Sequence, residues 1–297
     1  MRSPNRQHDV PLLSKYSSMS TARVILESTT LRWSSPVLFN DPFDVAREFE
    51  VDFSFEDIRK AIVARFRDYI DGSAEPKTQW SQLIVGEIRK RGKRREGREL
   101  ATLEDSLMLM AVPALTSIAG MRRIWEERIP GMRILCFSAV ADSPKMWAHY
   151  AGNHSGVVLQ FESSDERDSS WLLAQPVIYR SEKPSLPGVE EWVRSFLSEC
   201  EIDWDEYLRE YYYVKSPEWT YEQEYRVVSD RRRDESGLYS DYGFHPEDLR
   251  RVIVGVNADP ANTRRIVEFA RGYPNAEVRR AQIDHHARRI GLAPSAP

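Results

Sequence analysis

The stretch Trp219–Ser229 constrains the fold most, because its residues alternate in character along the chain. Aromatic and β-branched residues at a period of two predict a β-strand over 222–229. One face of that strand would carry Glu222, Glu224 and Arg226, each about 7 Å from the next. Two carboxylates and a guanidinium cost too much free energy to bury unpaired. This face therefore either meets solvent, as in a charged edge strand, or lines a polar cleft.

The composition is that of a globular protein and excludes several classes. Of 297 residues, 41% are hydrophobic and 30% are charged, which is enough to build a core. Lys and Arg number 42 against 46 Asp and Glu, so no global basic field indicates nucleic acid. Cys136 and Cys200 are interpreted as reduced thiols. Without an apolar run of membrane length or a signal-peptide core, we expect a cytoplasmic protein with no membrane partner.

The order of predicted elements indicates an α+β fold. We expect a mixed, mostly antiparallel sheet split into two packed parts, ending in a βαβ-like unit over 252–256, 260–271 and 276–283. A single domain is expected over 13–290, with flexible ends at 1–12 and 291–297.

Helical periodicity predicts an insertion at about 54–130 between β segments. Its helices are expected at 55–71, after a capping box at Ser54, and at 79–90 and 100–120. The stretch Arg89–Arg98 holds seven basic residues and one acid. It is either a solvated helix end or a contact for a phosphate backbone.

Two further regions carry polar or aromatic residues with a chemical use. A buried strand over 133–138 ends on Ser138, and a short helix after Pro144 carries Trp147, His149 and Tyr150. The Trp147 and Tyr150 rings belong either to the core or to a surface that stacks on a flat ligand ring. His149 is either a satisfied buried histidine or an acid–base group.

The first strands and the turn that follows complete the candidate set. Lys15 and Tyr16 lie on the first predicted strand, and Ser34 lies near the end of the second, at 30–35. In the turn Phe39–Phe43 we expect both phenylalanine rings to be buried, and Asn40 or Asp41 to bond the local backbone. Asn40 would also reach the cleft. The histidines show no metal-ligand spacing, and no metal is expected.

Together these blocks resemble a widespread bacterial family of uncharacterised domains. The similarity covers most of residues 13–256, with no settled activity attached. It is carried by Lys15-Tyr-Ser, Phe39-Asn-Asp-Pro-Phe43, Cys136-Phe-Ser138, Met146-Trp-Ala-His-Tyr-Ala151, Gly156-Val-Val-Leu-Gln-Phe161 and Trp219-x-x-Glu-x-Glu-Tyr-Arg226.

The order of the blocks is more distantly similar to the ADP-ribosyltransferase fold. Those enzymes place an Arg, His or Tyr on a first strand, a Ser or Tyr in the middle, and a Glu on a later strand. Glu222-Gln-Glu224 corresponds to the last block and Cys136-Phe-Ser138 to the middle one. Lys15-Tyr16 corresponds to the first block, although neither His nor Arg is present.

This resemblance implies NAD as the substrate, with Glu224 and Glu222 catalytic. Glu224 would stabilise positive charge on the ribose, and Glu222 would take a proton from the nucleophile. Ser138 would fix Glu224, and Tyr150 or Trp147 would stack on nicotinamide. Arg226 would contact a phosphate or pair with Glu224. The residues implied to bind NAD are Lys15, Tyr16, Ser34, Asn40, Ser138, Trp147, His149, Tyr150 and Arg226.

The leading hypothesis is therefore an enzyme that transfers ADP-ribose from NAD to a macromolecular target, either protein or nucleic acid. It would act as a toxin or phage-defence effector with an antitoxin or immunity partner. A second hypothesis is a nucleic-acid-binding or nuclease-like defence protein that uses the basic stretches 89–98 and 231–233. A third is a non-catalytic, ligand-sensing interaction domain.

Overall fold

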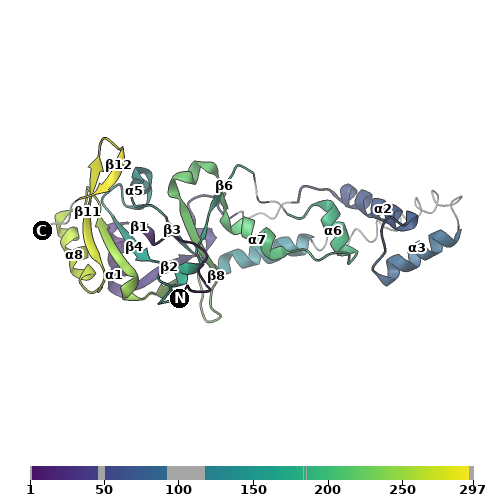
Figure 1. The fold of residues 1–297 in the computed structure, drawn as a ribbon, viewed down its shortest axis with the longest axis horizontal. Coiled ribbons are helices and arrows are strands. Elements are labelled where there is room, and N and C mark those ends of the chain that lie inside the picture. Colours follow the sequence, from purple (N-terminus) through teal and green to yellow (C-terminus); the bar gives the residue numbers. More distant parts are fainter. Residues whose placement is uncertain (1, 46–50, 92–117, 183, 185, 294–297) are drawn as a thin grey trace. The chain divides into compact units, whose positions relative to one another are not determined.

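The computed structural model describes residues 2–45, 51–91, 118–182, 184 and 186–293 (Figure 1). The chain divides into two compact units, each with its own hydrophobic core. Unit 1 comprises Met1–Val45, Ile129–Glu182 and Tyr212–Pro297, and unit 2 comprises Ala46–Arg128 and Lys183–Tyr211. The insertion predicted at about 54–130 thus corresponds to one of the two segments that build unit 2.

Unit 1 is built on a ten-stranded sheet in the order β12-β11-β10-β4-β1-β3-β2-β9, with β8 also paired to β3, and β5 to β8. The strands are β1 (Leu12–Ser17), β2 (Thr30–Ser34), β3 (Met132–Ser138), β4 (Val157–Glu162), β5 (Gln175–Pro176), β8 (Glu224–Asp230), β9 (Tyr239–Gly243), β10 (Leu249–Val254), β11 (Glu277–Asp284) and β12 (Arg289–Leu292). A separate parallel pair consists of β6 (Ile178–Tyr179) and β7 (Val214–Lys215).

The predicted α+β class with a mixed, mostly antiparallel sheet is confirmed. Within the ten-stranded sheet β10 and β11 are parallel, and the other described pairs are antiparallel. The two parallel strands are joined by helix α8 (Pro260–Ala270), so the βαβ-like C-terminal end is also confirmed. The sheet was expected to divide into two packed parts. Instead its strands are hydrogen-bonded into one sheet that opens along one edge of β3.

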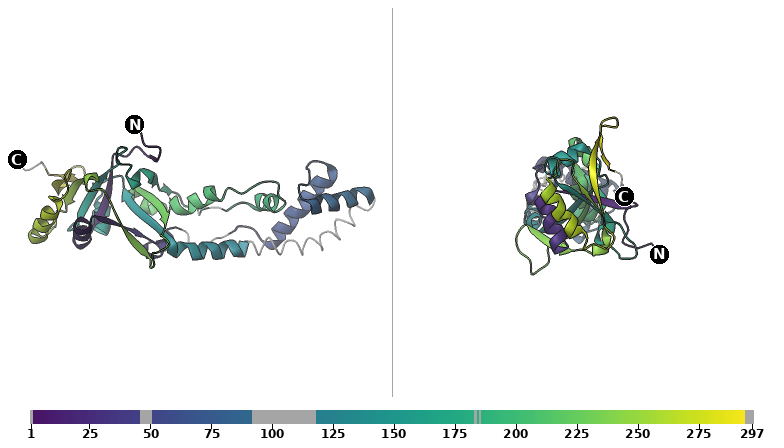
Figure 2. Two further views of the ribbon diagram at one scale, coloured as in Figure 1. Left: turned by 90° about the horizontal axis from the view of Figure 1, so that it is seen from below. Right: turned by 90° about the vertical axis from the view of Figure 1, so that its left-hand side faces the viewer.

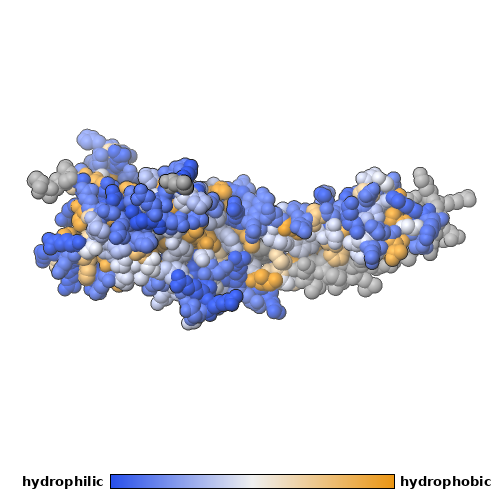
Figure 3. Space-filling model, turned by 60° about the horizontal axis from the view of Figure 1, so that its bottom comes forward, coloured by the Kyte–Doolittle hydropathy of each residue, from blue (hydrophilic) through white to orange (hydrophobic). Residues whose placement is uncertain are grey.

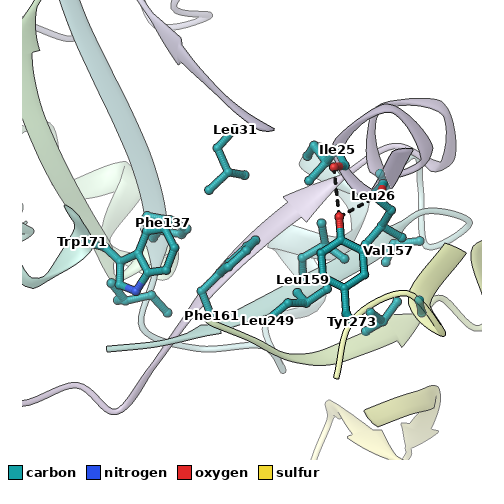
Figure 4. Packing of buried hydrophobic residues seen from close by; sticks show 14 of the residues in the cluster. Ile25, Leu26, Leu31, Phe137, Val157, Leu159, Phe161, Trp171, Leu249 and Tyr273 are labelled. Carbon is teal, nitrogen blue, oxygen red and sulfur yellow. Dashed lines mark hydrogen bonds between the residues drawn. The ribbon is translucent and has the colours of Figure 1, made fainter. Parts of the chain in front are cut away.

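Helices α1 (Met19–Ser28) and α8 cover one face of the sheet and pack against each other (Figure 2). Their cluster includes Leu159 and Phe161 of β4, and the Tyr273 hydroxyl donates to the Leu26 carbonyl at 2.8 Å (Figure 4). Helix α5 (Pro144–Tyr150) covers the other face. It packs against Val158 and Ile253, whose side chains alternate with those of the first cluster.

Unit 2 is helical in its described part. Its elements are α2 (Phe55–Asp71), α3 (Gln79–Arg91), a helical segment over 118–128, α6 (Val189–Phe196) and α7 (Trp204–Tyr213), whose last residues belong to unit 1. The predicted capping box at Ser54 and the first two predicted helices are confirmed. Residues 92–117, which include most of the predicted 89–98 basic stretch and 100–120 helix, lie outside the described part.

The segment before β1, predicted to be flexible, is bonded to the rest of unit 1. Arg6 pairs with Asp165 at 2.8 Å, and His8 bonds the Trp171 carbonyl at 2.8 Å. On the face shown in Figure 3, hydrophobic residues are scattered among hydrophilic ones. None of the helices in the described ranges combines the length and apolar character needed to span a membrane.

The turn Phe39–Phe43 differs from its prediction. Asp41 accepts a hydrogen bond from the Phe43 backbone N–H at 2.9 Å, as expected, but the Phe43 side chain is 83% exposed and Phe39 is half-buried. Burial of both rings was therefore wrong. The buried side chains at this turn are two aspartates, Asp41 and Asp44, and the sequence did not single out Asp44.

These exposures predict unequal effects of removing two phenylalanine rings in unit 1. Phe43→Ala should change the free energy of unfolding by less than about 0.5 kcal/mol, because the exposed ring loses little packing. The matched change Phe161→Ala should cost about 3–5 kcal/mol, since that ring is fully buried. Urea denaturation of both variants measures the difference, and a similar loss for the two would contradict the described packing.

Candidate functional site

The sheet of unit 1 opens along one edge of β3, and the candidate site lies there. The opposite edge of β3 pairs with β8 along its whole length, as far as Ser138 opposite Glu224. The open edge is shared, because β1 pairs with it at Ser138 and β2 at Ile134. Between these two points the Cys136 carbonyl accepts a hydrogen bond from the Lys15 ammonium, at 2.8 Å, where a paired strand would otherwise supply a backbone N–H.

A pocket of about 430 Å³ lies at this opening, a volume within the usual range for small-molecule sites. Most of the predicted site residues line it: Lys15, Tyr16, Ser34, Asn40, Ser138, His149, Tyr150, Glu222 and Glu224. Trp147 and Arg226 do not. Trp147 is fully buried with its ring edge-on to Tyr16, so of its two predicted roles, core residue or stacking surface, it has the first. Arg226 is also fully buried.

Five charged side chains form a buried ion cluster beside the pocket: Asp44, Lys215, Glu222, Glu224 and Arg226. The Lys215 ammonium bridges all three carboxylates at distances of 2.6–3.2 Å. The Arg226 guanidinium donates twice to Glu224, at 2.7 and 2.8 Å, and once to Asp44, at 2.7 Å. With every group ionised, three acids against two bases leave the ion cluster one net negative charge.

Of the two roles predicted for Arg226, its contacts favour pairing with Glu224 over contact with a phosphate. Both Glu224 oxygens accept a hydrogen bond from Arg226, and one of them also accepts from Lys215. Burial by itself would raise the pKa of Glu224, but the two cations outweigh it and hold that pKa well below its ordinary value. Glu224 is therefore ionised at neutral pH.

Glu222 does not lie on the strand, so the predicted strand start at 222 was wrong. Residues Pro217–Glu222 form a 3₁₀ helix, η4, and Gln223 follows with a left-handed φ of 42° before β8 begins at Glu224. This turn brings both carboxylates to the Lys215 ammonium. Burial raises the pKa of Glu222; Lys215 opposes that rise, and the charge of Glu224 adds to it.

Hydrogen bonds to neighbouring side chains fix Glu222 from two sides. The Tyr150 hydroxyl donates to its carboxylate at 2.6 Å, and the Asn40 amide donates to that hydroxyl at 3.3 Å. Burial and the bond to Glu222 raise the pKa of Tyr150, so the phenol stays protonated. The Ser138 hydroxyl donates to the Glu222 main-chain carbonyl at 2.6 Å. Ser138 therefore fixes Glu222, whereas we had predicted that it would fix Glu224.

Lys15 and Cys136 form the part of the pocket nearest the open edge of β3. Burial lowers the pKa of the Lys15 ammonium. Burial also raises the pKa of the Cys136 thiol, and the negative charge of Glu224 adds to the rise. A protonated thiol is a poor nucleophile, so Cys136 is a weaker candidate for a reacting group than the carboxylates of the pocket.

The sequence did not identify two members of the ion cluster, Asp44 and Lys215. Asp44 comes directly after the Phe39–Phe43 turn, and Lys215 lies between helix α7 and η4. One oxygen of Asp44, Oδ1, is buried without a hydrogen-bond partner among the described residues. The charge pattern at 222–226 was the signal that could have indicated them. Three charges that are buried there require partners of opposite charge from elsewhere in the chain.

Comparison with known proteins supports the predicted resemblance to a family of uncharacterised domains. Residues 146–227 match a family model described as "Protein of unknown function (DUF2971)". The matched segment contains α5 from Met146 onward, η4 and the Glu222–Arg226 part of the ion cluster, whereas Asp44 and the first three strands lie outside it. Neither the curated proteins nor the solved structures yielded a match.

The opposite pKa shifts of the two glutamates predict opposite effects on stability. Because the pKa of Glu224 is lower in the folded protein, its ionised form stabilises the fold above the ordinary glutamate pKa of about 4.3. That stabilisation is lost as pH falls toward the folded-state pKa. Glu224→Gln should cost about 3–5 kcal/mol at pH 7, since Arg226 loses a buried partner, and should weaken the acid dependence. Urea denaturation at neutral and acidic pH measures both effects.

Glu222→Gln is the matched control. In the parent protein the raised pKa of Glu222 favours the protonated carboxyl in the folded state, so the contribution of Glu222 to stability falls as pH rises through that pKa. A neutral glutamine should therefore keep or increase stability at pH 7. Equal losses for the two variants would contradict the different roles assigned to these carboxylates.

Proposed function

We propose that unit 1 binds NAD in this pocket and cleaves the bond between nicotinamide and ribose. The observation that carries the proposal is the convergence of two buried carboxylates, Glu222 and Glu224, on a pocket where the sheet opens between β1 and β2. Lys15 and Tyr16 of β1 and Ser138 of β3 line the same pocket. This arrangement has the block order of the ADP-ribosyltransferase fold and supports that resemblance.

The reaction makes an electrostatic demand that the ion cluster meets. When the bond from ribose C1′ to nicotinamide breaks, its electron pair leaves with nicotinamide and positive charge develops on the ribose. When Glu222 is ionised, as a general base must be, the ion cluster carries one net negative charge, which would stabilise the positive charge on the ribose as it forms. Glu224 supplies part of this field through its permanent ionisation, while its oxygens remain bound to Arg226 and Lys215.

Glu222 is the better candidate for moving a proton. Its raised pKa is closer to neutral than that of an ordinary glutamate, which suits a general base. Water or a nucleophile of a macromolecule would attack C1′ from the pocket and pass its proton to this carboxylate. With water as nucleophile, the products are ADP-ribose, nicotinamide and a proton.

Aromatic side chains at the pocket would accept the nicotinamide ring. Tyr150, His149 and Phe39 all line it, and Phe39 also lies under the Arg226 guanidinium, 5.6 Å from ring centroid to Cζ. Flat rings of this kind pack on a planar ligand. Since Trp147 is buried elsewhere, His149 and Tyr150 are the aromatic residues of α5 that remain for stacking.

The test is nicotinamide release from NAD, measured by chromatography with and without cell lysate as a source of targets. Glu222→Gln should lower the rate by about 10²-fold or more and leave the protein folded. The matched control is Glu235→Gln, because Glu235 is a hydrogen-bonded acid of unit 1 outside the pocket. Its rate should equal the parent rate. No nicotinamide release by the parent protein under either condition would refute the proposal.

A further inference from the structure

Helix α5 connects the pocket to the turn between β11 and β12. It carries His149 and Tyr150, which line the pocket, and Lys145 on its exposed first turn. The Ile290 backbone N–H donates to the Asp142 carbonyl at 3.0 Å, just before α5 begins. The Ile290 side chain also belongs to the buried cluster that α5 forms with the sheet. The start of β12 therefore lies beside α5.

The β11–β12 turn is basic and exposed. Residues 285–289 read His-His-Ala-Arg-Arg, and all are exposed. Arg288 and Arg289 make no ion pair with any of the described residues, so their charges are open to an anion. The guanidinium group matches phosphate geometry better than an ammonium does. Residues 249–293 hold nine arginines, no lysine and four acids, whereas acids outnumber bases in the whole chain.

Aromatic rings lie among these charges on α5 and η4. The Lys145 ammonium lies 5.0 Å from the Tyr221 ring centroid. The Tyr221 ring is in turn 5.9 Å from the His149 ring and 6.0 Å from the Trp219 ring. Tyr221 and Trp219 are half-buried, so part of each ring faces outward. Two acids lie on η4: the exposed Glu218, to which the Ser216 hydroxyl donates, and Glu222, which is buried at the pocket.

We propose that this surface, formed by residues 285–289, α5 and η4, binds single-stranded nucleic acid and leads it to the pocket. Cations placed among aromatic rings serve such ligands, because phosphates pair with the cations and unpaired bases stack on the rings. A base in a duplex is already stacked and has no free face to offer. The surface adjoins the pocket through α5, so a bound strand would present one nucleotide there.

Binding by this surface is independent of the NAD chemistry, but the role of nucleic acid as acceptor rests on the proposed function. In that step the C1′–nicotinamide bond breaks and its electrons leave with nicotinamide. A nucleophilic oxygen or nitrogen of the strand then bonds to C1′, and its proton passes to Glu222. The inference thereby chooses nucleic acid over protein as the macromolecular target.

The experiment is fluorescence anisotropy of labelled polyuridine and polythymidine with the full chain at increasing salt. The double variant Arg288→Glu/Arg289→Glu should weaken binding at least about 10-fold and reduce the salt slope by about 2. Tyr221→Ala should weaken binding about 10-fold with little change in the salt slope. The matched control Arg264→Glu/Arg265→Glu makes the same charge change on α8, at the other face of the sheet, and should bind like the parent.

Several results would overturn the inference. Binding that fails to weaken with salt, or that both double variants reduce equally, would show that these residues form no specific surface. Tighter binding to duplex DNA, or to phosphatidylserine vesicles with the same dependence on Arg288 and Arg289, would assign the surface to another ligand. When labelled NAD is supplied, transfer of its ADP-ribose label to proteins alone would refute the role of nucleic acid as acceptor. Binding without nicotinamide release would support the surface and contradict the proposed NAD cleavage.

Discussion

The buried pairing of Arg226 with Glu224 and Asp44 is the interaction on which the rest of the site depends. A fully buried guanidinium is costly to desolvate, and it is tolerated because three hydrogen bonds to carboxylates compensate it. Those carboxylates bring more negative charge than Arg226 balances, and Lys215 supplies the second cation. The shape of this pocket wall is therefore set by charge balance among separate segments rather than by apolar packing.

The elements that the sequence predicted well are those with local signals. Helix α2 has a capping box at Ser54 and glycine in the left-handed conformation at Gly72, and both lie inside or next to the segment they delimit. Strand β3 reads as a run of mostly apolar residues and was predicted over 133–138, one residue short of its observed start at Met132. The α8 crossover likewise has Asp259 as its cap and proline in its first turn.

Predictions failed where the outcome depended on one backbone conformation or on distant partners. Period-two alternation continued through Gln223, but that residue takes a left-handed φ that glutamine rarely adopts, so the strand begins after it. The requirement that buried charges be paired predicted that partners exist and could not identify Asp44 or Lys215. Phe43 was assumed to be core because it is aromatic, yet the buried side chains at this turn are those of Asp41 and Asp44. Short polar strands such as β9 and β12 carry little periodic signal.

The position of the ion cluster along the chain has a mechanical consequence. The polypeptide crosses between the two units four times, and Asp44 lies just before the first crossing while Lys215 lies shortly after the last. These two residues are joined directly at 3.2 Å. A bound molecule that shifted one of these side chains would therefore act on the other, so one ligand contact would reach both the place where the chain first leaves unit 1 and the place where it finally returns.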